Sequence, residues 1–207
     1  MLDDAISDPA TLREFVGAPI QRTLEKQLDH LDPHCVDFLA RSPIAMLSTA
    51  GADGRCDCSP RGGPPGFAHV IDAKHLALPD YKGNKRQDSH VNVMENPHVG
   101  LLFLIPGLGE TLRINGSAQL SRDPELLSVL ATRGDPPQLG LVIDVEEVYL
   151  HCAKACMRSQ VWDPSTWLPR EELPSATQIY RDHRDTPGLT VEQVEAELEE
   201  SFRTRMW

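Results

Sequence analysis

The first 42 residues have the apolar spacing of helices. Thr11-Leu-Arg-Glu-Phe15 matches an N-cap followed by a capping box, and Asp32-Pro33 predicts the start of a further helix that ends near Arg41. Between these two segments, four residues repeat at helical spacing: Leu24, Gln27, Leu28 and Leu31. The pattern therefore predicts a helical N-terminal arm.

After residue 42, the apolar and polar positions follow the period of short strands. Ile44–Thr49 and Arg55–Ser59 flank Asp53-Gly54, a pair typical of a tight turn between two strands. Further strand-like segments follow, separated by short turns: Phe67–Ile71, His75–Pro79, Val99–Ile105, Thr111–Leu120 and Leu139–Tyr149. Such a succession indicates an antiparallel barrel or sandwich.

Helices interrupt and follow these strands. They are predicted over Lys85–Glu95, from Asp123 to about Ala131, from near His151, and over the acidic segment Thr190–Arg203. We therefore expect a mainly β protein with α insertions, of the α+β class, built as a single domain. Its expected parts are an N-terminal helical arm (1–42), a barrel core (43–165) and a C-terminal helical tail (166–207).

Charge is distributed unevenly along the chain. The 207 residues have a net charge of -11 at pH 7, yet residues 51–133 hold nine acidic and nine basic side chains. The middle can therefore form a cationic pocket for a small anion, while the whole molecule repels nucleic acid and anionic membranes. The N-terminus lacks a signal-peptide pattern, and no apolar stretch is long enough to span a membrane. We expect a cytoplasmic protein that binds neither nucleic acid nor membrane.

The cysteines do not predict a disulfide framework. Their number is odd, five, in a chain without an export signal, which favours reduced thiols. Cys56-x-Cys58 and Cys152-x-x-x-Cys156 lack the two-residue spacing usual for zinc. We therefore expect no bound metal.

The densest polar segment, residues 79–89, leaves a strand, crosses a glycine turn and enters a helix. Backbone N–H groups at the start of a helix, together with Lys82, Lys85 and Arg86, would hold a phosphate by dipole and charge. The alternative is a solvated, charged turn. No GxSxG, HExxH, Walker or GxGxxG motif is present, so no catalytic group is predicted by spacing alone.

Four segments occur in a fixed order between residues 59 and 155: SPRG, GN-x-R-x-DS, NP-x-VGLLFLIPG and HCAKA. Together they resemble the pyridoxamine 5′-phosphate oxidase-like FMN-binding split-barrel proteins, and most closely a bacterial branch of FMN-dependent enzymes without an assigned substrate. The resemblance covers about residues 30–165. It implies a six-stranded antiparallel split barrel, a homodimer, and two FMN molecules at the dimer interface.

The same resemblance assigns cofactor-binding residues. Those that match the flavin-binding strand ends, the phosphate-binding turn and helix, and a neighbouring strand are Ser59, Arg61, Pro79, Asp80, Gly83, Asn84, Arg86, Ser89 and Arg113. Pro79 and Asp80 would lie beside the isoalloxazine ring. Asn84, Arg86 and Ser89 would bind the phosphate, in agreement with the anion site predicted for residues 79–89.

The chain departs from the authentic oxidases after its last strand, because nothing after Trp162 reproduces their paired Arg and His. Pyridoxamine phosphate is therefore not the expected substrate. Lys154 and Arg158 lie one helical turn apart. We predict that they form the substrate-facing wall with Trp162, and that Lys154 and Trp162 also contact the flavin. The alternative is that both cations only offset nearby acidic residues and that Trp162 belongs to the core.

The expected function is that of an FMN-dependent oxidoreductase acting on an unidentified small molecule, with NAD(P)H as a candidate electron donor. A flavin performs the redox step itself, so missing catalytic motifs do not disfavour an enzyme. Two alternatives stay open: a flavin-binding sensor or carrier without turnover, and a deazaflavin-dependent reductase.

Overall fold

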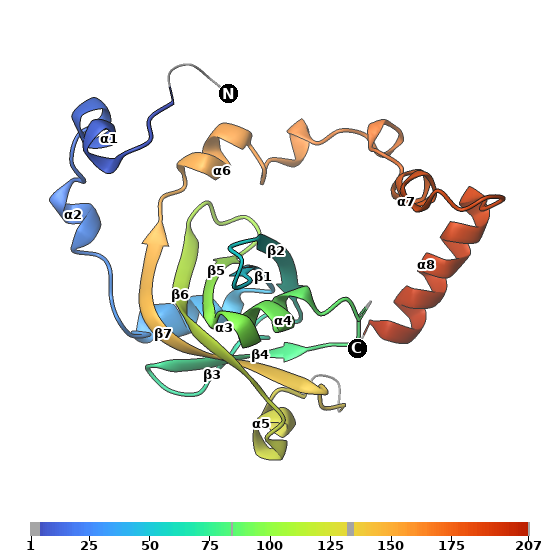
Figure 1. Ribbon diagram of the computed structural model, residues 1–207, viewed down its shortest axis with the longest axis horizontal. Helices are drawn as coiled ribbons and strands as arrows, with labels where there is room; N and C mark the ends of the chain where they lie inside the picture. The colour runs from blue at the N-terminus through green and yellow to red at the C-terminus, as the bar shows by residue number, and fades with distance from the viewer. Residues whose placement is uncertain (1–4, 84, 132–134, 207) are drawn as a thin grey trace.

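The protein was analysed as a computed structural model that describes residues 5–83, 85–131 and 135–206. Its strands form one antiparallel sheet in the order β2-β1-β5-β6-β7-β4-β3 (Figure 1). The strands are β1 (Ile44–Ala50), β2 (Cys56–Gly62), β3 (His69–Val70), β4 (His75–Asp80), β5 (His98–Leu104), β6 (Thr111–Ser121) and β7 (Leu139–His151). The α+β class with an antiparallel sheet is confirmed. The described sheet has seven strands with β2 and β3 at its edges, where the resemblance implied six.

The helices lie around this sheet and beyond it. They are α1 (Pro9–Val16), α2 (Gln21–Leu24), α3 (Pro33–Arg41), α4 (Asp88–Glu95), α5 (Pro124–Val129), α6 (Lys154–Ser159), α7 (Ala176–Arg184) and α8 (Val191–Arg205). Two short 3₁₀ turns, Pro164–Thr166 and Arg170–Glu172, join α6 to α7. Figure 1 shows this C-terminal connector, with α7 and α8, standing away from the sheet. No helix among the described residues is long and apolar enough to cross a membrane.

The core lies on one face of the sheet. Alternate residues of the central strands are almost fully buried there, and α3 adds Phe38 and Leu39. Leu47, Leu101, Ile114 and Val148 form a continuous buried row, because each is paired across the sheet with the next. The same alternation places the intervening residues on the opposite face, which is only half-buried.

The N-terminal arm is less helical than its apolar spacing predicts. Leu28 pairs with β7 as an isolated bridge: its N–H donates to Val148 O (2.9 Å), and its carbonyl accepts from Val148 N (2.8 Å). Leu31 N donates to Ala73 O (2.7 Å). The helix predicted through Leu28 and Leu31 is therefore wrong beyond α2, because these leucines bury against the sheet from an extended segment.

Several helix ends also differ from the sequence-based expectation. The N-cap of α1 is Asp8 rather than Thr11, because the Asp8 carboxylate accepts from two first-turn N–H groups. β7 continues to His151, so α6 begins only at Lys154. α7 was not predicted, and α4 begins at Asp88 instead of Lys85.

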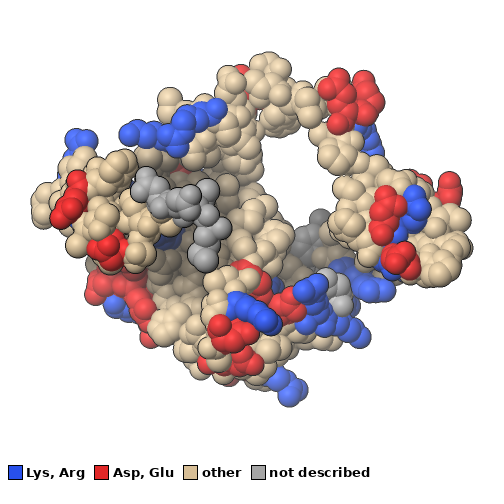
Figure 2. Space-filling model, turned by 45° about the horizontal axis from the view of Figure 1, so that its top comes forward, with Lys and Arg blue, Asp and Glu red and all other residues tan. Residues whose placement is uncertain are grey.

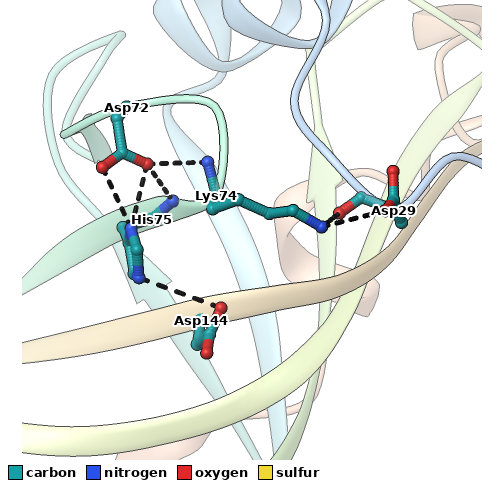
Figure 3. Close-up of polar contacts among 5 residues, drawn as sticks. All are labelled: Asp29, Asp72, Lys74, His75 and Asp144. Atoms are coloured by element: carbon teal, nitrogen blue, oxygen red, sulfur yellow. Dashed lines mark hydrogen bonds and ion pairs between the residues drawn. The ribbon is translucent and has the colours of Figure 1, made fainter.

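A polar cluster fastens the extended N-terminal segment to the β3–β4 turn and β7 (Figure 3). Lys74 Nζ donates to Asp29 Oδ2 (3.1 Å), and His75 Nδ1 lies 2.9 Å from Asp72 Oδ1. The other ring nitrogen of His75 is 3.9 Å from Asp144 Oδ1. Hydrogen bonds from His30, and then from Lys74, lower the pKa of Asp29 to about 2. Exposed ion pairs contribute little to stability, so the backbone hydrogen bonds and leucines of this segment contribute most of its attachment to the sheet.

The long β6–β7 pair has a bulge between Asn115 and Gly116. Asn115 Nδ2 donates to Glu147 Oε1 (3.0 Å), and Gln27 Nε2 donates to Glu147 Oε2 (2.9 Å), so the bulge also receives the N-terminal arm. A Cβ at Gly116 would lie 2.0 Å from the carbonyl oxygen of Asp144. The bulge therefore requires glycine at this position.

Replacing Gly116 tests this requirement. We expect Gly116→Ala to lower the free energy of unfolding by about 1–3 kcal/mol, because backbone must move to admit the methyl group. Urea denaturation measures the change. Gly100→Ala is the matched control, since its Cβ would meet side chains rather than backbone: the Asn115 oxygen at 3.3 Å, which can move, and Ser48 Cβ at 4.0 Å. Equal stability losses for both variants would contradict the argument.

Candidate functional site

A cavity of about 290 Å³ opens between β2, the end of β4 and the start of α4. Its lining comes from residues 57–61, from Asp80, Tyr81 and Gly83, and from residues 85–90. Acidic and basic side chains are interspersed over the face drawn in Figure 2, rather than segregated. The electrostatic effect of each charged residue in this cavity therefore depends on the groups that it contacts.

The β1–β2 hairpin provides one wall of the cavity. Gly51 N donates to Arg55 O (3.0 Å), and Gly54 turns the chain at a φ of +79°, as the Asp-Gly pair predicts. The Asp57 carboxylate accepts from Thr49 Oγ1 (2.8 Å) and from Asn92 Nδ2 (3.1 Å). Because Asn92 belongs to α4, this carboxylate fixes the helix against the hairpin.

The turn that leads into α4 is strained. Lys85 and Gln87 have φ values of 62° and 63°, in the left-handed region that non-glycine residues rarely adopt. Gln87 is the N-cap of α4 and makes no side-chain capping bond. Because the first N–H groups of a helix have no partners within it, this end of α4 can bind an anion.

Two cavity-lining side chains have buried nitrogen atoms without hydrogen-bond partners among the described residues: Arg61 Nε and His90 Nε2. Arg61 Nη1 lies 3.3 Å from Asp80 Oδ1, and His90 Nε2 lies 3.4 Å from the same oxygen. Arg61 and Asp80 side chains are 21% and 15% exposed, so their interaction is only weakly screened by solvent. Burial lowers the pKa of His90, Asp80 opposes this effect, and Arg61 adds to it.

The structure brings most of the predicted FMN-binding residues to this cavity. Those that line it are Ser59, Arg61, Asp80, Gly83, Arg86 and Ser89. Pro79 is buried in β4 directly before Asp80, and Asn84 lies outside the described residues. Arg86 is 76% exposed and pairs with Asp88, so it lies nearer the rim than Arg61 does. Predicted residues that are up to 30 positions apart in the sequence thus line the same cavity.

Four other predicted residues lie elsewhere in the chain. Arg113 is on the half-buried face of the sheet, with its guanidinium 5.3 Å from the centre of the Tyr149 ring. Trp162 Nε1 donates to Leu108 O (2.9 Å) and lines a separate cavity of about 360 Å³. Lys154 and Arg158 are on α6 and do not contribute to the lining of the 290 Å³ cavity.

Sequence reasoning missed three residues of the site: Asp57, Gln87 and His90. Gln87 and His90 fall within or next to the segment predicted to bind an anion, so their position was a usable signal. Asp57 alternates with Cys56 and Cys58 in an edge strand, and no local pattern shows that Asn92 donates to it. Among the described residues, no group of three or more His, Cys, Asp or Glu could hold a metal ion.

The sheet and the cavity define an α+β protein with a pocket between an edge hairpin and the N-terminus of a helix. Residues 31–152 match the sequence model of the pyridoxamine 5′-phosphate oxidase family, and this match spans more than half of the chain. The protein belongs to that family. No curated protein sequence matches significantly.

The solved structures that match this chain share little sequence with it. HupZ of Group A Streptococcus is 18% identical, with a TM-score of 0.47 over 58% of this chain and 99% of its own. A Clostridium acetobutylicum protein related to general stress protein 26 is 18% identical, with a TM-score of 0.43 over 56% and 83%. HutZ, a heme storage protein of Vibrio cholerae, is 16% identical, with a TM-score of 0.41 over 58% and 93%.

Proposed function

We propose that this protein is an FMN-dependent oxidoreductase acting on an unidentified small molecule. The observation that supports this most directly is the Arg61 guanidinium, which is largely buried, lines the cavity and has an unpartnered Nε. A buried cation with an unused donor fits a phosphate ester, because charge-assisted hydrogen bonds are strongest where water is excluded. The uncapped start of α4 is suited to the same anion.

The residues present fit FMN in the following arrangement. Arg61, Arg86 and the hydroxyl groups of Ser59 and Ser89 would bind the phosphate together with the N-terminus of α4. Gly83 lines the same cavity, and the backbone of Pro79 and Asp80 would contact the flavin ring. When bound, FMN supplies the ability to accept and pass on a hydride or electrons. The protein's part is to position the cofactor and set the charge around it.

The cavity of a single chain is too small to cover a whole cofactor and substrate. Its volume, about 290 Å³, is at the lower limit of ligand pockets, which range over roughly 300–1,000 Å³. A second surface over the open side of the cavity would cover more of a bound cofactor. We propose that a second copy of the chain provides it, as a homodimer.

The half-buried face of the sheet is suited to this dimer. Met46, Leu102, Arg113 and Tyr149 form a row across four strands on that face, and none of them is fully buried. The C-terminal connector and α7 stand off from the sheet and leave an opening (Figures 1 and 2). Exposed apolar residues of this region include Trp167, Leu168, Leu173, Ile179 and Tyr180. Paired in this way, each chain would bring Arg113, Lys154, Arg158 and Trp162 to the other chain's cavity.

The first prediction concerns cofactor identity and binding. The purified protein should be yellow and release FMN, and Arg61→Ala and Arg86→Ala should weaken FMN binding by about ten- to a hundredfold, since a lost charge-assisted contact costs roughly 1.5–3 kcal/mol. Arg61→Ala should have the larger effect, because Arg61 is more buried than Arg86. Quenching of FMN fluorescence measures the affinity.

Lys82→Ala is the matched control, because Lys82 is in the same turn but does not line the cavity. Its FMN affinity should equal that of the wild type. FAD or a deazaflavin as the released chromophore, or equal small effects of all three substitutions, would refute the assignment.

The second prediction separates an enzyme from a passive binder. Under anaerobic conditions, NADPH or NADH should bleach the flavin absorbance of the FMN-loaded protein, and a small-molecule acceptor should restore it. The same protein with photoreduced flavin controls for whether the site permits reduction. Two results together would indicate a sensor or carrier. The flavin would photoreduce normally but not be reduced by NADPH or NADH, and no acceptor would reoxidise the photoreduced flavin faster than buffer alone does.

The third prediction concerns assembly. Light scattering should give about twice the 23.0 kDa mass of the chain. Leu102→Glu, which places a charge on the half-buried face, should shift the mass toward one chain and weaken FMN binding at the same time. Arg55→Glu, at the exposed hairpin tip, is the control and should remain dimeric. A wild-type protein that binds FMN as a single chain would exclude the shared site.

A further inference from the structure

His90 is held in an unusual position beside the cavity. It lies in the first turn of α4, and its side chain is only 6% exposed. The ring nitrogen Nδ1 contacts Oε1 of Gln87, and because a carbonyl oxygen accepts hydrogen bonds we assign the proton of the neutral imidazole to Nδ1. With this assignment Nε2 carries no proton in the neutral ring, and it faces Asp80 Oδ1 at 3.4 Å without a hydrogen bond.

His90 Nε2 and Asp80 Oδ1 can stay close without a hydrogen bond because a cation, Arg61, neutralises the Asp80 carboxylate. Arg61 Nη1 lies 3.3 Å from the same carboxylate oxygen. Burial lowers the pKa of His90, Asp80 raises it, Arg61 lowers it, and the net direction is downward. The positive end of the α4 dipole acts in the same direction. With Arg61 paired to Asp80, His90 therefore stays neutral at neutral pH.

The remaining charges around His90 nearly cancel. The charged or titratable side chains that line the cavity with it are Asp57 and Arg61 from β2, Asp80 and Tyr81 at the end of β4, and Lys85, Arg86 and Asp88 from the turn and α4. Arg86 pairs with Asp88, and Asp57 is occupied by hydrogen bonds from Thr49 and Asn92. Among the described lining residues, His90 is the one histidine, the residue type whose charge changes most readily near neutral pH.

An anion in the cavity changes this balance in two ways. It shares the charge of Arg61, whose Nε is unused, and so reduces the neutralisation of Asp80. It also adds negative charge directly beside His90 and the end of α4. Both changes favour a proton on Nε2, which would turn the repulsive contact with Asp80 into a charge-assisted hydrogen bond.

We propose that His90 takes up one proton from solvent when an anionic ligand of the phosphate class binds in the cavity, with Arg61 and Asp80 transmitting the change in charge. The new N–H bond forms on Nε2, the proton is donated to Asp80 Oδ1, and no electron moves. The proposal rests on the cavity being the phosphate site of the proposed flavin function. His90 is thus a positioning residue that links ligand affinity to pH.

Isothermal titration calorimetry of FMN binding tests this coupling. Measured at pH 7.5 in buffers of different ionisation enthalpy, the wild type should take up close to one proton per site, and its FMN affinity should rise by up to about tenfold per pH unit lowered while His90 is neutral in the free protein. His90→Gln should abolish most of the uptake and flatten the profile. His98→Gln, at an exposed histidine, is the control and should behave as the wild type does.

A second measurement needs no substituted protein, and its ligand does not itself exchange protons as the FMN phosphate does. Sulfate, whose charge is fixed over this range, is added to the wild-type protein, and long-range ¹H–¹⁵N spectra report the ring nitrogens of His90. We expect the Nδ1–H form without ligand and the doubly protonated ring with sulfate or FMN at the same pH.

The outcomes distinguish this inference from the flavin assignment. FMN binding without proton uptake, with His90 still neutral, overturns the inference and leaves the proposed function intact. Sulfate that binds and protonates His90, in a protein that does not bind FMN, supports the inference and overturns the flavin assignment. If neither anion binds, both proposals fail.

Discussion

The geometry of the candidate site depends on the hydrogen bonds that the Asp57 carboxylate accepts. It accepts hydrogen bonds from Thr49 on β1 and from Asn92 on α4, and Ser89 Oγ lies 3.4 Å from it. At the hairpin tip, Ala52 N donates to Glu95 Oε2 (3.2 Å), so the helix is attached at both ends. These bonds determine where the first turn of α4 lies, and hence where its unpaired N–H groups can meet a ligand.

Fixing α4 in this way imposes strain on the turn before it. The chain must pass from the end of β4 to Asp88 in seven residues, and it does so with Lys85 and Gln87 in the left-handed region. Each such residue costs on the order of 1–3 kcal/mol unless surrounding contacts stabilise it. The turn is thereby kept close to the cavity instead of continuing α4 backwards, which is why the predicted start at Lys85 was three residues too early.

Local patterns predicted the strands well and the long-range contacts poorly. Period-two alternation and Asp53-Gly54 located β1 and β2. The polar segment 79–89 was expected to bind a phosphate, which stays a prediction, and Gly83, Arg86 and Ser89 from it line the 290 Å³ cavity. Leu28 looked helical because it lies four residues from Leu24 and three from Leu31, which is the spacing of one helix face. Only its pairing with Val148, 120 residues later in the chain, decides for an extended backbone. The contacts of His90 likewise depend on Asp80 and Arg61, from two other elements.

Charge distribution links the fold to the proposed chemistry. A chain with a net charge of -11 would repel a phosphate ester unless cations were collected locally, and burial makes each collected cation more effective. In the proposed function Arg61 would meet this need, although its guanidinium pairs with Asp80 as long as no ligand competes for it. Asp80 neutralises the buried charge of Arg61, because an unpaired buried cation would destabilise the fold. In the proposed function, the same pair would serve stability without ligand and recognition with it, and the imidazole of His90 beside it would be the group whose charge follows the exchange.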